Sequence, residues 1–263
     1  MKSIIELSRA KREQHAIVMV AAYDALMART VAESEADVIL VGDSAAMVVH
    51  GYPSTVHATV EMMCTHVAAV RRGAPEIIVV ADMPFLTARK GVAAALDAAG
   101  ALMQAGATAV KLEGVTGHED VIERIVTSGI PVMGHIGLTP QSVHQLGGYR
   151  FQGREPAEAE RLRREARALE ELGAFAVVLE CVPERLATTI TEERAIPTIG
   201  IGAGAGTAGQ VLVISDLLGL DARFQPRFSR KYLDGHGLIR DAVTQFARDV
   251  RGARFPARAE VLA

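Results

Sequence analysis

Polar side chains stand where short apolar runs of this sequence come to an end. The runs are rich in Val, Ile, Leu and Ala, and the side chains that end or follow them are Tyr23, Asp24, Asp43, Ser44, Asp82, Lys111, Glu113, His135 and Glu180. If the runs are parallel strands of one closed sheet, their carboxyl ends lie together and these side chains converge. The spacing therefore predicts one polar site that several strands build jointly.

Asp43 and Asp82 end consecutive runs, so their carboxylates are expected to lie close together. Two carboxylates in a partly dry pocket repel each other unless a cation or a proton lies between them. Oxygen ligands favour Mg²⁺, which keeps several waters and leaves positions open for the oxygens of a substrate. The alternative is that each Asp only caps the helix or turn after it. Because Glu113 and Glu180 are expected on the same rim, we favour the magnesium site.

Three further side chains complete the predicted site. Lys111 lies inside an apolar run, where an ammonium needs an anionic partner, and a substrate carboxylate or Glu113 would serve. His135 is expected to bind substrate, to orient a carboxylate or to be purely structural. Glu180 follows the apolar run 177–179, so its carboxylate loses hydration and becomes a stronger base, suited to removing a carbon-bound proton. The alternative for Glu180 is a charged strand end that faces solvent.

The elements that must position these residues alternate along the chain. Runs of strand type lie at residues 16–22, 38–41, 77–81, 109–112, 132–134, 174–179, 198–201 and 211–214. Segments with apolar residues at helical spacing lie at 25–33, 60–72, 92–104, 119–127, 158–172 and 184–193. This alternation over 263 residues predicts an α/β fold, a (β/α)8 TIM barrel forming a single catalytic domain over residues 1–263. The region from about residue 221, with a helix at 238–250, is expected to cap the barrel or to meet another subunit.

Composition narrows the class of protein. The net charge of -3, from 28 basic and 31 acidic residues, provides no basic surface for nucleic acid. No apolar run of about 18 residues predicts a membrane span, and the charged residues near the start argue against a signal peptide. Cys64 and Cys181 have no metal-binding spacing, which favours buried free thiols in a soluble, cytoplasmic protein.

Two other features receive structural interpretations. The Gly-rich segment 200–204 has some likeness to a dinucleotide-binding loop, but no acidic residue stands at the expected position and the helix after it is weak, so we reject that function. Tyr149 and Phe151, in the long aperiodic stretch 136–156, are expected to pack against the protein, with stacking on a ligand ring as the alternative.

The polar strand ends also belong to motifs that resemble a known enzyme family. The motifs are Ala22-Tyr23-Asp24, Val41-Gly42-Asp43-Ser44, Arg71-Arg72-Gly73-Ala74-Pro75, Ala81-Asp82-Met83-Pro84-Phe85, Lys111-Leu112-Glu113-Gly114, Gly134-His135-Ile136-Gly137-Leu138-Thr139-Pro140-Gln141, Gly147-Gly148-Tyr149, Leu179-Glu180-Cys181-Val182-Pro183 and Ile199-Gly200-Ile201-Gly202-Ala203-Gly204. In this order and over most of the chain, they resemble the 3-methyl-2-oxobutanoate hydroxymethyltransferase family, also called ketopantoate hydroxymethyltransferase. The series is far more specific than any single motif.

The resemblance implies an enzyme of pantothenate biosynthesis on a (β/α)8 barrel. It would transfer a hydroxymethyl group from 5,10-methylenetetrahydrofolate to 3-methyl-2-oxobutanoate, giving 2-dehydropantoate through a Mg-stabilised enolate. The family commonly forms a decamer of two pentameric rings, so a homo-oligomer is expected. The partners implied are therefore small molecules, a 2-keto acid and a folate, and further copies of the chain.

The resemblance also implies roles for individual residues. Asp43 and Asp82 would be Mg²⁺ ligands, with Glu113 as a third, directly or through water. The keto acid would be held by Asp43, Ser44, Asp82 and Lys111, with His135 as a further contact. Glu180 would be the catalytic base that removes the C3 proton.

Two other interpretations stay open. A Mg-dependent carbon-carbon lyase or mutase of the phosphonopyruvate mutase/isocitrate lyase type would share the barrel and the keto-acid chemistry. Such enzymes often carry a Lys-x-Cys-Gly loop, whereas segment 87–91 of this chain has no Cys. A catalytically inactive binding barrel is the other interpretation, because Ala45-Ala46 stand where the family usually has Leu-Gly.

Overall fold

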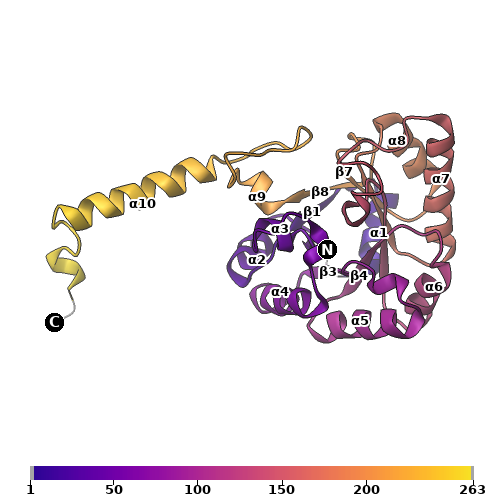
Figure 1. Cartoon of the computed structure of the whole chain (residues 1–263), viewed down its shortest axis with the longest axis horizontal. Coiled ribbons are helices and arrows are strands. Elements are labelled where there is room, and N and C mark those ends of the chain that lie inside the picture. The colour runs from indigo at the N-terminus through magenta and orange to yellow at the C-terminus, as the bar shows by residue number, and fades with distance from the viewer. Residues whose placement is uncertain (1–2, 262–263) are drawn as a thin grey trace. The chain divides into compact units, whose positions relative to one another are not determined.

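The computed structural model describes residues 3–261, which form two compact units. The first unit ends at Leu212 and contains the barrel, and the second spans Val213–Ala263. Figure 1 shows both, with the first coloured from indigo to orange and the second towards yellow.

Eight parallel strands close into a barrel in chain order, as the sequence predicts for a (β/α)8 fold. The strands are β1 Ile17–Ala21, β2 Val38–Val41, β3 Ile78–Asp82, β4 Ala109–Glu113, β5 Val132–Gly137, β6 Ala176–Glu180, β7 Thr198–Ile201 and β8 Gly209–Val213. The amide of Ile17 donates to the carbonyl of Ala208 at 3.0 Å where the last strand meets the first. A closed sheet leaves no strand edge unpaired, so every strand end can contribute to one rim.

Helices surround the strands, as Figure 1 shows for α4 to α8. They are α1 Ile4–Arg12, α2 Ala25–Ala32, α3 Ala45–Val48, α4 Val60–Gly73, α5 Val92–Gln104, α6 Glu119–Thr127, α7 Pro156–Glu171 and α8 Glu184–Glu193, with short 3₁₀ turns η1 Thr55–His57, η2 Thr87–Arg89 and η3 Pro140–Ser142. A side-chain cap fixes the start of α2: the Asp24 carboxylate accepts hydrogen bonds from the amides of Leu26 and Met27, both at 2.9 Å. On α6, Val121, Ile122 and Ile125 are buried at helical spacing, which turns that face towards the sheet.

The strands are apolar on both faces because helices cover the outside and side chains fill the inside. All residues of β2, β3 and β5 are buried. At Gly134 in β5 the helix α7 comes so close that a Cβ would collide with the side chain of Leu169. Glycine at this position therefore allows α7 to pack directly on β5.

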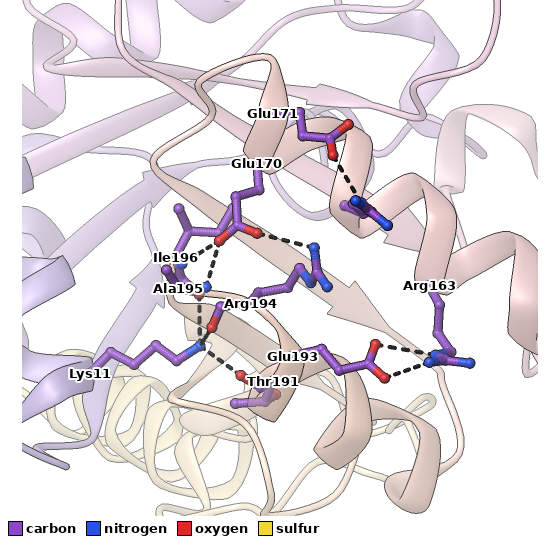
Figure 2. Close-up of polar contacts among 10 residues, drawn as sticks. Lys11, Arg163, Glu170, Glu171, Thr191, Glu193, Arg194, Ala195 and Ile196 are labelled. Atoms are coloured by element: carbon purple, nitrogen blue, oxygen red, sulfur yellow. Dashed lines mark hydrogen bonds and ion pairs between the residues drawn. The ribbon is translucent and has the colours of Figure 1, made fainter.

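A cluster of partly buried polar contacts joins α1, α7, α8 and the segment before β7 (Figure 2). The Lys11 ammonium donates to the carbonyls of Thr191 at 2.6 Å, of Ile196 at 3.0 Å and of Arg194. The Glu170 carboxylate accepts from the amides of Ala195 and Ile196 and from the Arg194 guanidinium. We call these residues the Lys11 cluster. Because α1 precedes β1 and the segment 194–196 precedes β7, the cluster lies at the amino ends of the strands.

The second unit contains α9 Ile214–Leu217, α10 Gly235–Arg251 and the 3₁₀ turn η4 Arg258–Glu260. The predicted helix at 238–250 is confirmed, and it begins earlier because the Asp234 side chain caps it by accepting from the Gly237 amide at 3.3 Å. Exposed apolar side chains lie along α10 at Leu238, Ile239, Val243, Phe246 and Val250. A role of this region as a cap or a subunit contact stays a prediction. In residues 3–261 no helix combines the length and apolar character needed to cross a membrane.

Candidate active site

The strand register brings the predicted side chains together at the carboxyl ends of β2 to β6. Asp82 of β3 is paired with Lys111 of β4, Glu113 of β4 with His135 of β5, and Gly137 of β5 with Glu180 of β6. Asp43, Asp82, Lys111 and His135 are each at most 4% exposed. We call Asp43, Asp82, Lys111, Glu113, His135 and Glu180 the acidic site, and the prediction that they converge is confirmed.

Asp43 and Asp82 are direct neighbours. The amide of Asp43 donates to Asp82 Oδ2 at 3.0 Å, and a Cβ on Gly42 would lie 3.6 Å from the same oxygen. Burial, together with repulsion by Asp82 and Glu113, raises the pKa of Asp43 well above its ordinary value. The pair therefore carries unfavourable electrostatic energy that a bound cation would relieve.

Ser44 lies beside this pair and is held by Tyr23. The two hydroxyl oxygens are 2.8 Å apart, and Tyr23 is 3% exposed. Ser44 begins the short helix α3 without capping it through its side chain. Its hydroxyl is therefore available to a ligand beside Asp43.

Lys111 faces Asp82 across the β3–β4 pair. Its Nζ lies 3.0 Å from Asp82 Oδ1 and 3.0 Å from His135 Nδ1. The sequence left Glu113 as an alternative partner, but the ion pair forms with Asp82 because that residue stands opposite Lys111 in the register. Burial opposes the ammonium, yet the negative charges of Asp82, Glu113 and Asp43 keep the pKa of Lys111 above its ordinary value.

His135 lies between two glutamates. Its Nε2 is 3.1 Å from Glu180 Oε2, and its Nδ1 is 3.6 Å from Glu113 Oε1. Burial and the charge of Lys111 disfavour the protonated ring, but Glu113 and Glu180 outweigh them and leave the pKa of His135 raised. Because an ammonium can only donate, the neutral ring accepts from Lys111 at Nδ1 and carries its proton on Nε2.

The Glu180 side chain is 15% exposed, whereas those of Asp82 and Glu113 are each 6% exposed. The next residue, Cys181, has a left-handed backbone with φ of 48°, a conformation that residues with a side chain rarely adopt. Two backbone hydrogen bonds of 2.9 Å hold it, from the Cys181 amide to Ile201 and from the Gln152 amide to Cys181. The sharp turn fixes the direction in which the chain leaves β6 behind Glu180.

Gln141 is a site residue that the sequence reasoning missed. Its side-chain amide donates to Asp43 Oδ2 at 2.8 Å and to the Met83 carbonyl at 3.0 Å, while its backbone amide donates to Glu113 Oε2 at 3.0 Å. It thus orients two carboxylates that come from different strands. Gln141 ends one of the family-like motifs, and that was the one available signal.

The packing prediction for Tyr149 and Phe151 is wrong, since they are 59% and 42% exposed. The Tyr149 hydroxyl lies 3.9 Å from Met47 Sδ. Burial and the charges of Glu180, Asp43 and Glu113 raise the pKa of Tyr149, so its ring lies close enough to the acidic site to sense those charges. Cys64 and Cys181 were expected to be buried free thiols: both are free, but only Cys181 is buried, whereas Cys64 is half-buried.

The acidic site fits a hard divalent cation. Three carboxylates, of Asp82, Glu113 and Asp43, act on the Lys111 ammonium, and a fourth, of Glu180, lies against His135. Within residues 3–261, the contact described for Asp82 Oδ1 is the Lys111 ammonium at 3.0 Å, which leaves the second lone pair of this oxygen for a cation. The same residues contain no group of three or more His, Cys, Asp or Glu side chains in a ligand arrangement. Asp43 and Asp82 would thus be the protein ligands, with waters or substrate oxygens filling the remaining positions.

A hollow of about 960 Å³ adjoins the acidic site. It lies over the loops that follow β3, β4 and β5, and α7 forms its outer wall. Glu113 and Gln141 line it, so the hollow opens onto the acidic site. Lining by both apolar and charged side chains is typical of a small-molecule pocket.

The fold and this site together define a (β/α)8-barrel enzyme whose chemistry takes place at the carboxyl ends of the strands. Residues 2–258 match the family model described as ketopantoate hydroxymethyltransferase. The 3-methyl-2-oxobutanoate hydroxymethyltransferase of Coxiella burnetii is 50% identical over 252 residues, 95% of each chain. That of Bdellovibrio bacteriovorus is 47% identical over 260 residues, 99% of each chain. The chain belongs to the ketopantoate hydroxymethyltransferase family.

Solved structures of other enzymes share the fold. A 2,3-dimethylmalate lyase of the PEP mutase/isocitrate lyase superfamily has a TM-score of 0.65 and 19% identity, covering 95% of this chain and 88% of its own. A phosphonopyruvate hydrolase in complex with oxalate and Mg²⁺ has a TM-score of 0.62 and 13% identity, covering 99% and 93%. At such identities the likeness shows the barrel alone, whereas the family membership makes the chain a hydroxymethyltransferase and an enzyme.

Proposed function

We propose that the chain transfers a hydroxymethyl group from 5,10-methylenetetrahydrofolate to 3-methyl-2-oxobutanoate in pantothenate biosynthesis, with Mg²⁺ bound at Asp43 and Asp82. The new C–C bond joins C3 of the keto acid to the donated carbon, water supplies the hydroxyl oxygen, and tetrahydrofolate leaves with 2-dehydropantoate. The observation that carries the proposal is the buried excess of carboxylates around Lys111 at the strand ends. Family membership supports the transfer chemistry.

Bound Mg²⁺ would supply a Lewis acid that polarises the keto group and makes the C3 proton acidic. Lys111, held 3.0 Å from Asp82, places a positive charge where negative charge develops on the substrate oxygen. The Ser44 hydroxyl, fixed by Tyr23, is placed to donate to the substrate carboxylate. These groups hold the keto acid before any bond breaks.

Glu180 is the proposed base for the C3 proton. It is partly exposed, so it can meet a substrate, and His135 Nε2 lies 3.1 Å from its Oε2 and orients it. Glu113 accepts from the Gln141 amide and faces His135, a position from which it would contact the metal through water.

Proton exchange tests this function without the folate. When the enzyme is incubated with Mg²⁺ and 3-methyl-2-oxobutanoate in D₂O, we expect deuterium to replace the C3 proton. NMR measures the rate of this exchange. Glu180→Gln is expected to slow exchange about 100-fold or more, whereas Glu184→Gln, on the neighbouring helix, keeps the wild-type rate. Unchanged exchange in Glu180→Gln would remove this residue from its role. Retro-aldol assay with 2-methylisocitrate tests the lyase alternative.

A homo-oligomer, by family resemblance a decamer, is the proposed assembly. The exposed apolar side chains along α10, from Leu238 to Val250, support a contact between subunits. Light scattering on the purified protein measures the mass. A monomer at micromolar concentration would contradict this assembly.

A further inference from the structure

The hollow beside the acidic site is too large for the keto acid alone. Its volume of about 960 Å³ is at the upper end of the roughly 300–1,000 Å³ that pockets for drug-sized ligands occupy. A five-carbon oxo acid bound at Asp43 and Asp82 would leave this space empty, because neither residue lines it. The hollow therefore has room for a second, larger molecule.

The two spaces meet at Asp82 and Glu113. Met83, the residue after Asp82, lines the hollow, and so does Glu113 itself. A ligand in the hollow can therefore place one of its atoms next to a keto acid bound over Asp82. This is the relation that a carbon donor and its acceptor require.

The walls of the hollow divide into apolar and charged parts. Met83, Phe85, Leu86, Leu112 and Leu146 provide apolar surface, and Phe85 and Leu86 are 39% and 42% exposed. Flat aromatic rings bury such surface at little cost in conformational freedom. These side chains suit the pterin and aminobenzoyl rings of a folate.

Two cations line the hollow, and they differ in their partners. Arg161 donates to Glu165 at 2.9 Å, so its charge is already balanced. Arg89 donates to the carbonyl of Thr116 at 3.2 Å and pairs with no carboxylate within residues 3–261. Its guanidinium also lies against Gly114, where a Cβ would be 3.1 Å from Nη2. Arg89 is thus the cation that is placed to receive an anion from a ligand.

We propose that this hollow binds the folate donor and that Arg89 binds the carboxylates of its glutamate tail. The rings pack on the apolar wall and the one-carbon unit points towards Asp82 and Glu113. The assignment rests on the proposed function and adds the subsite and the specificity residue for the second substrate. Specificity follows from the same contact: a donor without glutamate leaves Arg89 without its partner.

Binding measurements with two ligands test the assignment. Tetrahydrofolate carries a glutamate and tetrahydropteroate does not, and titration calorimetry under anaerobic conditions gives both dissociation constants. Arg89→Ala is expected to weaken the binding of tetrahydrofolate about tenfold or more, the size expected for loss of a charge-assisted hydrogen bond. The binding of tetrahydropteroate should not change. Arg89→Lys should recover part of the loss. Phe85→Ala should weaken both ligands alike.

Lys90→Ala is the matched control, because Lys90 is an exposed neighbouring cation that does not line the hollow. It should bind both ligands as the wild type does. In turnover, Arg89→Ala should raise the KM for the methylene donor and leave the KM for the keto acid unchanged. C3 exchange in D₂O, which needs no folate, should also stay at the wild-type rate and shows that the variant is folded.

The outcomes separate the two proposals. If Arg89→Ala binds tetrahydrofolate as tightly as the wild type, or loses both ligands equally, the role of Arg89 is wrong. If Phe85→Ala also binds both normally, the hollow is not the folate subsite. An absence of C3 exchange in the wild type contradicts the proposed function instead.

Discussion

Each end of the barrel holds a lysine, but the two differ in burial and in partners: Lys11 is half-buried and hydrogen-bonded to backbone carbonyls, whereas Lys111 is fully buried among carboxylates. In the Lys11 cluster three backbone carbonyls surround the ammonium, and Glu170 accepts from two amides and Arg194. In the acidic site Lys111 has Asp82 and His135, while Asp43, Glu113 and Glu180 add negative charge. The Lys11 cluster, whose charges all have partners, stabilises the fold. The acidic site, which has more negative than positive charge, can still bind a ligand.

Asp43→Asn should give the largest difference between the two ends of the barrel, because it should lower activity without lowering stability. Asp43→Asn keeps the shape and removes a buried charge that Asp82 and Glu113 repel. We expect activity to fall about 100-fold or more, because a metal ligand is lost, and stability without metal to stay equal or rise. Steady-state kinetics and urea unfolding measure both. A large loss of stability would mean that the acidic site is structural after all.

Metal addition should stabilise the protein through the acidic site alone. At about 100 times its dissociation constant, Mg²⁺ adds about 2.7 kcal/mol to the free energy of unfolding. Removal by EDTA reverses this in the wild type. Asp43→Asn should lose the effect, and Lys11→Met should keep it. Thermal unfolding measures the stabilisation. If Mg²⁺ stabilised the wild type and Asp43→Asn equally, the ion would bind elsewhere.

In the Lys11 cluster, by contrast, removal of a charge should lower stability and leave activity unchanged. Lys11→Met leaves three carbonyls without their donor, and we expect a loss of about 2 kcal/mol in the free energy of unfolding with turnover unchanged. Arg12→Met, one residue further along α1 and exposed, is the control and should change stability little. Chemical unfolding with an activity assay tests both variants. A variant that stays stable but loses turnover would overturn the comparison.

The smallest expected effect concerns Cys181, beside Glu180. Burial, and secondly the charge of Glu180, raise the pKa of the Cys181 thiol to about 12, so at pH 8 only about one thiol in 10,000 is ionised. In a Cys64→Ser background we expect very slow reaction with Ellman's reagent, and a modest acceleration in Glu180→Gln, since its charge is gone. Absorbance at 412 nm follows the reaction. Rapid labelling in both variants would show that this side of the site opens to solvent.

The barrel was predictable because short apolar runs alternate along the chain with segments of helical spacing, and the first six runs end at or near a polar residue. Val38–Val41 and Thr198–Ile201 match their predicted bounds, whereas β5 continues to Gly137 because Gly134 and His135 interrupt its apolar pattern. The helix Ile4–Arg12 was missed, since only Leu7 and Ala10 are buried among its charged residues.

Contacts between distant segments limited the prediction of the site. The strand ends identify Asp82 and Lys111, but their pairing needs the register between β3 and β4. Gln141 lies in a loop, and no local pattern shows that it spans Asp43 and Glu113. Arg89 follows from the fold in the same way, since its place beside the hollow depends on loops from three strands.

The missing side chain at Gly134 has an effect beyond packing. A methyl group there would collide with Leu169 Cδ1, so the buried Leu169 side chain of α7 would have to move. Leu169 and Arg161, which lines the hollow, both belong to α7, and His135 follows Gly134, so a displaced Leu169 would affect a contact that lies between the hollow and the acidic site. Any attempt to change the width of the hollow should therefore take this contact between β5 and α7 into account.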